Sequence, residues 1–194
     1  MKRKPLKKSA LSTIRIIAGQ WRGRKLPVAE IDGLRPTGDR IRETLFNWLG
    51  DDIAGARCLD LFAGSGILGL ESLSRGAAQV TALDASRMAV SALVEASQTL
   101  AASNMQAMQM DAIQWLKSKP AGPFDVVFID PPFKAGLLDE ALALLDAADC
   151  LNAGALIYIE RDRDHDLPQL PARWQPYKDK VAGNVSYGLY IFVA

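Results

Sequence analysis

The sequence predicts an α/β fold with a doubly wound, mostly parallel sheet, and three observations predict it. Short apolar runs alternate with amphipathic segments along most of the 194 residues. One apolar run leads into a glycine-rich turn at residues 64–69, and a later one ends in Asp130-Pro131-Pro132-Phe133. In a sheet of order 3-2-1-4-5 these two strand ends lie next to each other. We therefore expect one site where they meet.

The first 25 residues are strongly basic, although the whole chain carries a formal net charge of only +1. They contain nine Lys or Arg and no acid, whereas the remainder has 14 basic and 22 acidic residues, so the two parts carry +9 and −8. A cationic end on an acidic body indicates a polyanionic partner such as RNA or DNA. For residues 1–12, a solvated and flexible tail is an equal alternative.

Residues 13–32 are predicted to form a β-hairpin extension, and residues 33–194 the main domain. The two strands of the hairpin, 13–17 and 22–28, are rich in β-branched residues. Cations next to an aromatic side chain suit a phosphate backbone and a stacked base. The candidate RNA-binding residues are Arg15, Trp21, Arg22, Arg24 and Lys25. Packing of the hairpin on the domain through its apolar side chains is compatible with one such binding face.

A turn-rich connector at residues 33–38 precedes a helix predicted over residues 39–49. Thr37 or Asp39 can cap the N-terminus of this helix. Arg35 and Thr37 are also candidates for contact with a bound cofactor or with RNA. Composition supports capping and packing equally well for both.

The glycine-rich turn follows an apolar run, Cys58 to Phe62, that is typical of a buried parallel strand. Its glycines match the spacing G-x-G-x-x-G, which suggests a dinucleotide with its pyrophosphate at the helix N-terminus. Asp60 argues against that ligand, because a carboxylate at the strand end repels a pyrophosphate. The same carboxylate suits the ammonium and sulfonium groups of S-adenosylmethionine. The expected cofactor contacts are Asp60, Phe62, Gly64 and Gly66, with a ligand-free turn as the alternative.

Two further acids come at the ends of the next two predicted strands, 79–83 and 106–110. Asp84 lies 20 residues after Gly64, the spacing at which an acid accepts both ribose hydroxyls of an adenosine. Asp111 can accept the adenine amino group, or it can cap the helix that follows it. The helices predicted in this part of the chain cover residues 67–74, 86–102 and 112–117.

The fourth strand of the predicted sheet, residues 124–129, is an almost continuous apolar run that ends at Asp130. Pro131 and Pro132 lack N–H groups, so this corner presents carbonyl and carboxylate acceptors but few donors. Such a corner suits an amino group. Phe133 offers a face on which a planar base can stack. A proline-terminated strand without a ligand is the alternative.

The remaining elements are a helix, a strand and a closing antiparallel hairpin, predicted over residues 137–148, 155–159, 174–180 and 185–193. A polar loop is expected at residues 160–166, and it contains His165, the only histidine of the chain. We expect His165 to be exposed, so general-base chemistry by histidine is not expected.

The two cysteines, Cys58 and Cys150, form neither a disulfide framework nor a zinc pattern, which indicates a reducing, cytoplasmic setting. No apolar run approaches the length of a membrane span, and the basic start lacks the apolar core of a signal peptide. We expect no metal site, no membrane contact and a monomeric protein.

Four stretches of the chain carry a resemblance to a known family: Ile14 to Val28, Leu34 to Thr37 with Asp39 to Leu49, Asp60 to Gly69, and Asp130 to Phe133. Together they resemble the bacterial small-subunit (16S) rRNA guanine-N2 methyltransferases, the RsmD family, over residues 13–194. The resemblance implies a class I S-adenosylmethionine-dependent methyltransferase, Rossmann-like, with a seven-stranded sheet and a hairpin that helps to engage RNA. Family members often have Glu where this chain has Asp84.

By this resemblance the substrate is 16S rRNA, within the small ribosomal subunit or an assembly intermediate. A flipped guanine would present its N2 in line with the sulfonium methyl group. Asp130 and the Pro131 carbonyl would accept the amine hydrogens, so that positioning contributes most of the acceleration. The expected catalytic residues are Asp130, Pro131, Pro132 and Phe133.

Three other functions remain open. A DNA or RNA methyltransferase acting on adenine or cytosine amino groups is the nearest, because a similar corner serves adenine N6, although so short a chain lacks a sequence-reading insertion. An NAD-dependent oxidoreductase conflicts with Asp60 and with the corner at Asp130. A non-catalytic RNA-binding module explains the basic N-terminus but not the Asp130 to Phe133 motif.

Overall fold

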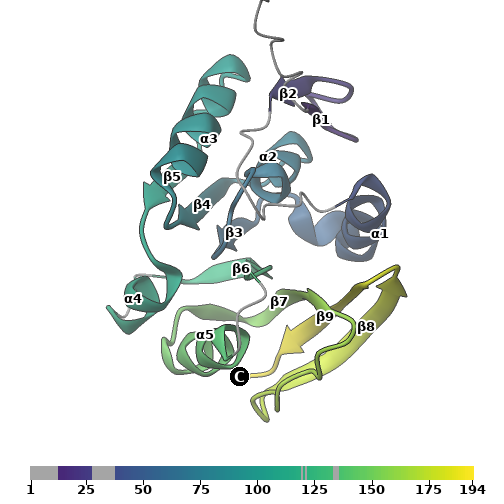
Figure 1. The fold of residues 1–194 in the computed structure, drawn as a ribbon, viewed down its shortest axis with the longest axis vertical. Helices are drawn as coiled ribbons and strands as arrows, with labels where there is room; N and C mark the ends of the chain where they lie inside the picture. The colour runs from purple at the N-terminus through teal and green to yellow at the C-terminus, as the bar shows by residue number, and fades with distance from the viewer. Residues whose placement is uncertain (1–12, 28–37, 119, 121, 133–135) are drawn as a thin grey trace, which may run out of the picture.

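The computed structural model describes residues 13–27, 38–118, 120, 122–132 and 136–194. Within this part of the chain, seven strands form one sheet of order β5-β4-β3-β6-β7-β9-β8, with helices on both of its faces (Figure 1). Several predictions concern residues outside the described ones, namely the tail at 1–12, residues 28–32, Arg35, Thr37 and Phe133.

The strands of the sheet are β3 (Arg57–Asp60), β4 (Gln79–Asp84), β5 (Met105–Gln109), β6 (Phe124–Ile129), β7 (Leu151–Asp162), β8 (Trp174–Ala182) and β9 (Val185–Phe192). The helices are α1 (Asp39–Leu49), the short 3-10 helix η1 (Gly50–Ile53), α2 (Ile67–Ser74), α3 (Arg87–Thr99), α4 (Ala112–Lys117) and α5 (Leu137–Ala147). Strands β3 to β7 pair in parallel, whereas β9 pairs antiparallel with both β7 and β8. The predicted order 3-2-1-4-5 and the mostly parallel seven-stranded sheet are confirmed.

The sheet separates two apolar cores. One lies between the sheet and α1, α2 and α3, and it includes Phe128 of β6. The other lies between the sheet and α4 and α5, and it includes Val127 of the same strand. Successive side chains of a strand point to opposite faces, and β6 is covered on both. This double burial is the reason why its sequence is apolar almost throughout.

The predicted bounds of α2 and β6 agree with the structure, but two features of other helices were predicted wrongly. Helix α3 ends at Thr99 rather than residue 102, because Ala101 takes a left-handed φ of 54° that no α-helix can continue. Asp39 does not cap α1, whose N-cap is Gly38 without a side-chain hydrogen bond. Asp39 instead accepts a hydrogen bond from Arg42 at 2.6 Å.

Strand β7 is longer than predicted. The prediction of a polar loop at residues 160–166 is wrong for residues 160–162, which belong to this strand. In the antiparallel pairing with β9, Glu160 lies opposite Tyr187 and Asp162 opposite Val185. These backbone pairings extend the strand through polar residues, which an apolar pattern cannot predict. His165 is exposed, as predicted.

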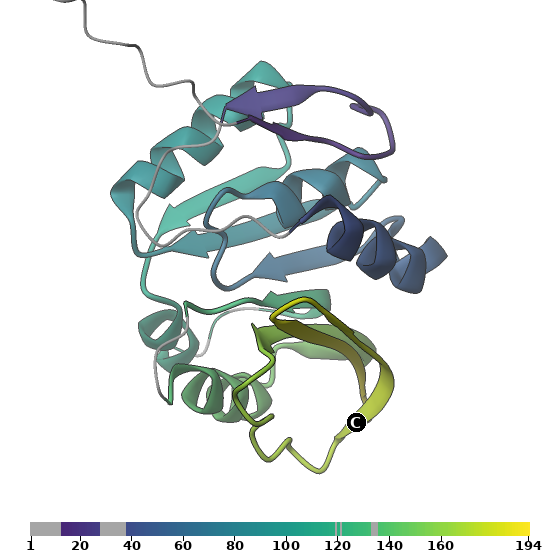
Figure 2. The same cartoon turned by 45° about the vertical axis from the view of Figure 1, so that its right-hand side comes forward.

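The N-terminal segment forms the predicted hairpin, with strands β1 (Thr13–Arg15) and β2 (Lys25–Pro27) in antiparallel pairing. The predicted second strand is shortened because Arg22 and Gly23 belong to a turn, which is followed by a hydrogen bond from the Arg24 N–H to the Trp21 carbonyl at 3.0 Å. Figure 2 shows the hairpin beside α2 and α3, on the same side of the sheet as α1.

A buried ion network holds the hairpin against the domain. Glu71 of α2 accepts the backbone N–H groups of Ile17 at 2.8 Å and of Ala18 at 3.0 Å. Its carboxylate also faces the guanidinium groups of Arg42 at 3.5 Å and of Arg75 at 2.8 Å. The side chains of Glu71 and Arg42 are both fully buried. One carboxylate of α2 therefore joins the hairpin to two helices.

The network continues from Arg42, which donates to the Arg15 carbonyl at 3.0 Å and pairs with Asp39 at the start of α1. Next to it the hairpin backbone approaches the end of α2 so closely that a Cβ at Gly19 would lie 1.8 Å from the Ser74 carbonyl oxygen. Gly19 also has a left-handed φ of 79°. Only glycine satisfies both conditions.

Replacing Glu71 with Gln should lower the free energy of unfolding by about 3 kcal/mol, because it removes a charge that compensates the buried Arg42. Urea-induced unfolding measures the difference. Glu140→Gln is the matched control, since Glu140 is half exposed in its ion pair with Lys117, and it should cost less than about 1 kcal/mol. A loss for Glu71→Gln no larger than that of the control would contradict the role given to the network.

Candidate active site

Three of the predicted acids lie at the carboxyl edge of the parallel strands. Asp84 ends β4, Asp60 ends β3, and Asp130 follows β6 directly. Strands β3 and β6 are neighbours, and the N–H of Leu61, the residue after the end of β3, donates to the carbonyl of Phe128 near the end of β6 at 3.1 Å. The sheet thus brings together the glycine turn and the Asp130 corner, which are far apart in the sequence.

The turn after β3 requires glycine at two positions. Gly64 and Gly66 have φ angles of 51° and 71°, in the left-handed region that other residues rarely adopt. Gly66 is the N-cap of α2, and a Cβ there would lie 2.2 Å from the Leu93 side chain of α3. At these two positions the backbone of the turn therefore carries no side chain.

Asp84 supports this turn directly. One of its carboxylate oxygens accepts the Gly64 N–H at 2.8 Å, and the other accepts the Ser86 N–H at 2.7 Å. Each carboxylate oxygen has a second lone pair for another donor. The predicted contact with the ribose hydroxyls stays a prediction, and the sequence did not indicate the structural role of Asp84.

Asp60 is buried, with 2% of its surface exposed. The pKa of Asp60 is raised from 3.8 to about 7. Burial is the largest cause and the charge of Asp84 also raises the pKa, whereas a backbone hydrogen bond from Phe62 lowers it. Without a ligand, the contribution of Asp60 to stability is therefore greatest below pH 3.8 and is lost as the pH rises through about 7. A cation next to Asp60 would favour its ionised form.

The corner after β6 is half-buried at Asp130, buried at Pro131 and exposed at Pro132. Beside it, on β7, the buried Tyr158 hydroxyl donates to Glu160 at 2.7 Å. The pKa of Tyr158 is raised well above its ordinary value by burial, by Glu160 and, to a smaller extent, by Asp130. Glu160 is not among the site residues predicted from the sequence. Like Asp84 and Asp130, Glu160 directly follows an apolar run, and that signal could have indicated it.

Asp111 lies farther from this corner, because β3 and β4 separate β6 from β5 in the sheet. Asp111 is exposed after the edge strand β5, and its side chain accepts the Gln114 N–H at 2.9 Å, as an N-cap does. Its contact with adenine stays a prediction.

The predicted RNA-binding residues lie on the hairpin and differ in exposure. Arg15, Arg22, Arg24 and Lys25 are exposed, whereas Trp21 is half-buried against the apolar core. Arg24 also donates to the Thr99 carbonyl at the end of α3, at 3.3 Å. The hairpin thus packs through one face and exposes cations on another, and its contact with RNA stays a prediction.

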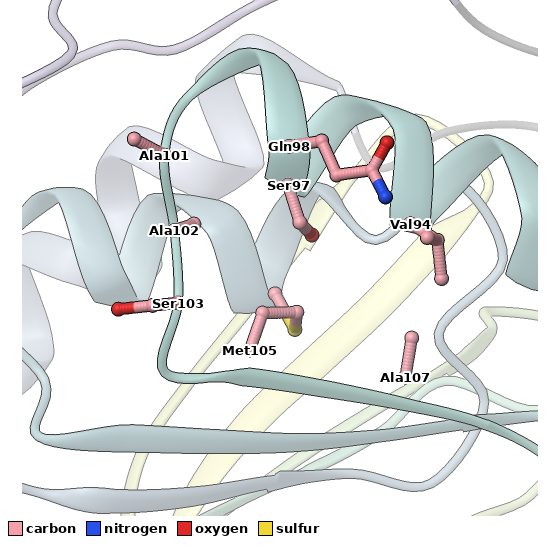
Figure 3. A pocket seen from close by; sticks show the side chains of 8 residues that line it. All are labelled: Val94, Ser97, Gln98, Ala101, Ala102, Ser103, Met105 and Ala107. Atoms are coloured by element: carbon pink, nitrogen blue, oxygen red, sulfur yellow. The ribbon is translucent and has the colours of Figure 1, made fainter.

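A pocket of about 390 Å³ lies away from the carboxyl edge, between the C-terminal half of α3 and the beginning of β5 (Figure 3). It is lined by Val94, Ser97, Gln98, Ala101, Ala102, Ser103, Met105 and Ala107, none of them charged. The described residues contain no group of three His, Cys, Asp or Glu that could hold a metal ion. Among them there is also no helix long and apolar enough to cross a membrane.

Comparison with known proteins agrees with this geometry. Residues 14–191 match the family model described as Conserved hypothetical protein 95. The ribosomal RNA small subunit methyltransferase D of Escherichia coli K12 is 50% identical over 182 residues, which cover 94% of this chain and 91% of that protein. That of Haemophilus influenzae is 48% identical over 185 residues, which cover 94% and 95%. The solved Escherichia coli protein yhhF has a TM-score of 0.88 at 48% identity and covers 94% of this chain and 99% of its own.

The mostly parallel seven-stranded sheet, with a glycine turn and acids at its carboxyl edge, defines a class I S-adenosylmethionine-dependent methyltransferase. Within this class, the chain belongs to the family of the ribosomal RNA small subunit methyltransferase D proteins, which is also the family predicted from its motifs.

The affinity for S-adenosylmethionine should rise with pH, by up to about tenfold per unit between about pH 5 and pH 7, and level off above. A cationic ligand binds ionised Asp60, and below its raised pKa of about 7 the carboxyl group must first lose a proton. Isothermal titration calorimetry measures this profile. Asp60→Asn should bind more weakly and with a flat profile. A wild-type profile as flat as that of the variant would contradict the assignment of Asp60.

Proposed function

We propose that this protein transfers a methyl group from S-adenosylmethionine to the exocyclic N2 of a guanine in small-subunit rRNA. The observation that carries the proposal is the juxtaposition of the Asp130-Pro131-Pro132 corner with Asp60 and the glycine turn, at one edge of the sheet. A protein 50% identical over 182 residues is named as a methyltransferase of small-subunit rRNA, which supports RNA as the substrate.

The residues at this edge fit S-adenosylmethionine by their chemistry. Asp60 is a buried carboxyl group that gains from a neighbouring cation, and it would hold the ammonium group. Asp84 would accept the ribose hydroxyls, and Asp111 the adenine amino group. The remaining proposed contacts are Phe62, Gly64, Gly66, Arg35 and Thr37. When bound, S-adenosylmethionine supplies an electrophilic methyl group on a sulfonium.

The guanine amine needs help to react, because its lone pair is delocalised into the ring. Asp130 and the Pro131 carbonyl would accept its two hydrogens, which favours a pyramidal nitrogen with its lone pair aimed at the methyl group. Transfer of the methyl group to N2 would leave the electron pair of the broken carbon–sulfur bond on the sulfur of the bound cofactor. N2 then loses one proton, which Asp130 can accept. Pro132 and Phe133 would complete the corner, Phe133 as a stacking face.

The exposed cations of the hairpin support an RNA partner. Arg15, Arg22, Arg24 and Lys25 would contact phosphates, and Trp21 would contact a base at the edge of the same surface. We further propose that the protein acts as a monomer in the cytoplasm, on the small ribosomal subunit or an assembly intermediate.

Incubation with radiolabelled S-adenosylmethionine tests the function directly. The two substrates are deproteinised rRNA and small subunits that lack the modification, and the label is then mapped to a nucleotide. Label on guanine N2 supports the proposal, whereas label on adenine or cytosine supports the nearest alternative. A non-catalytic RNA-binding module, or an oxidoreductase, would transfer no label.

Substitution of Asp130 should slow the chemical step without weakening cofactor binding. For Asp130→Ala we expect a single-turnover rate about 10² to 10³ times lower, the size of effect of removing one preorganised polar group. Asp130→Asn should be intermediate, because a carboxamide keeps one acceptor oxygen. Rapid-quench methylation and calorimetric titration of S-adenosylmethionine measure the two quantities. Turnover near the wild-type rate in Asp130→Ala would exclude this corner as the catalytic site.

Removal of two exposed cations from the hairpin should weaken RNA binding and reduce its salt dependence. Deleting the whole hairpin is a poor test, because it also removes partners of the buried Glu71. The double variant Arg22→Ala, Lys25→Ala should reduce the slope of log affinity against log salt by about 0.7 to 0.9 for each phosphate that it no longer neutralises. The double variant Lys178→Ala, Lys180→Ala on β8 is the matched control. Equal slopes for the two double variants would contradict the RNA-binding role.

A further inference from the structure

Two carboxylates lie side by side at the corner after β6. Strands β6 and β7 are parallel, with Phe128 opposite Tyr158. Asp130 and Glu160 each lie two residues further along, Asp130 directly after the end of β6, so the alternation of side chains would place both on the face that Phe128 and Tyr158 share, which α1, α2 and α3 cover. Neighbouring strands are about 4.8 Å apart, so the two carboxylates can reach adjacent atoms of one small planar ligand.

The environment of Glu160 is unusual for a carboxylate. Its residue is only 5% exposed, and it lies opposite Tyr187, whose ring stacks on Trp48 at 5.4 Å. Burial of a charged group is costly, whereas the pairing of β7 with β9 uses only the backbone and does not require a glutamate. The Tyr158 hydroxyl fixes one Glu160 oxygen at 2.7 Å, and a carboxylate has about four acceptor positions in total. A rigid acceptor beside Asp130 is the result.

The chemistry of the bases decides what such a pair of acceptors recognises. Guanine, adenine and cytosine each carry an exocyclic amine that Asp130 could hold. The ring nitrogen next to that amine carries a proton in guanine (N1–H), but it is an acceptor in adenine (N1) and in cytosine (N3). A carboxylate accepts and cannot donate, so a second carboxylate attracts the guanine edge and repels the other two.

We propose that Glu160 selects guanine, by accepting its N1–H while Asp130 and the Pro131 carbonyl hold the N2 amine, with Tyr158 as the residue that positions Glu160. This inference rests on the proposed function and adds the reason for the choice of base.

The test compares guanine with 2-aminopurine, which keeps the amine at C2 but lacks the carbonyl oxygen at C6 and therefore has an acceptor in place of N1–H. Substrate rRNA is assembled by ligation with either base at the position mapped by the labelling experiment, and kcat/KM is measured for both. The wild-type protein should prefer guanine. In Glu160→Gln the carboxamide can donate to the acceptor of 2-aminopurine, so the preference should fall about 10- to 100-fold. The intrinsic reactivities of the two amines cancel when the guanine preference of the variant is divided by that of the wild-type protein.

Two further variants separate base selection from a structural role. Glu160→Asp keeps the charge but shortens the reach, so activity on guanine RNA should fall while activity on 2-aminopurine RNA does not. Glu140→Gln, on the surface of α5, removes a remote carboxylate and should leave both activities unchanged. If Glu160→Gln and Glu160→Asp lower both activities equally, or neither, the inference is wrong. If the wild-type protein methylates no rRNA, the proposed function itself has failed.

Discussion

The pairing of β3 with β6 is the interaction on which the rest of the candidate site depends. It joins segments about 70 residues apart in the chain, with Asp60 of β3 paired to Phe128 of β6. Because the strands are parallel, their carboxyl ends lie at one edge, where the glycine turn and the Asp130 corner become neighbours. The methyl transfer that we propose needs both motifs, since one suits a cofactor and the other suits an amine.

The acids at this edge of the sheet lie in different environments. Asp84 accepts two backbone N–H groups of the surrounding turns, and Asp60 is buried with a raised pKa. Glu160 is fixed by a tyrosine beside the half-buried Asp130. Acids that look equivalent in the sequence thus differ in burial and hydrogen bonding, and these differences separate the roles that we propose for them, namely supporting the turn, facing a cation and facing a base. Such divergence of environments is typical of active sites.

The N-terminal hairpin is part of this arrangement through Glu71. That residue binds the hairpin backbone and two buried or half-buried arginines, so the orientation of the exposed cations is coupled to α1 and α2. The hairpin is therefore a basic surface held in one orientation relative to the carboxyl edge. Its described strands do not behave as a separate, loosely tethered arm.

Features that depend on local chemistry could be predicted from the amino-acid sequence alone. The sheet order and the two halves of the site were predicted from the apolar runs, the glycine turn and the prolines after Asp130. Each of these signals lies within a few residues, since it depends on hydrophobic periodicity, on the backbone freedom of glycine or on the missing N–H of proline.

Features that depend on distant partners could be recognised only in the folded chain. Glu160 belongs to β7 because it pairs with β9. Glu71 holds the hairpin because it accepts backbone N–H groups that lie more than 50 residues away in the chain. Asp39 does not cap α1 but pairs with Arg42, three residues further along, whose guanidinium is buried because it faces Glu71 of α2, a contact between helices that no local pattern specifies.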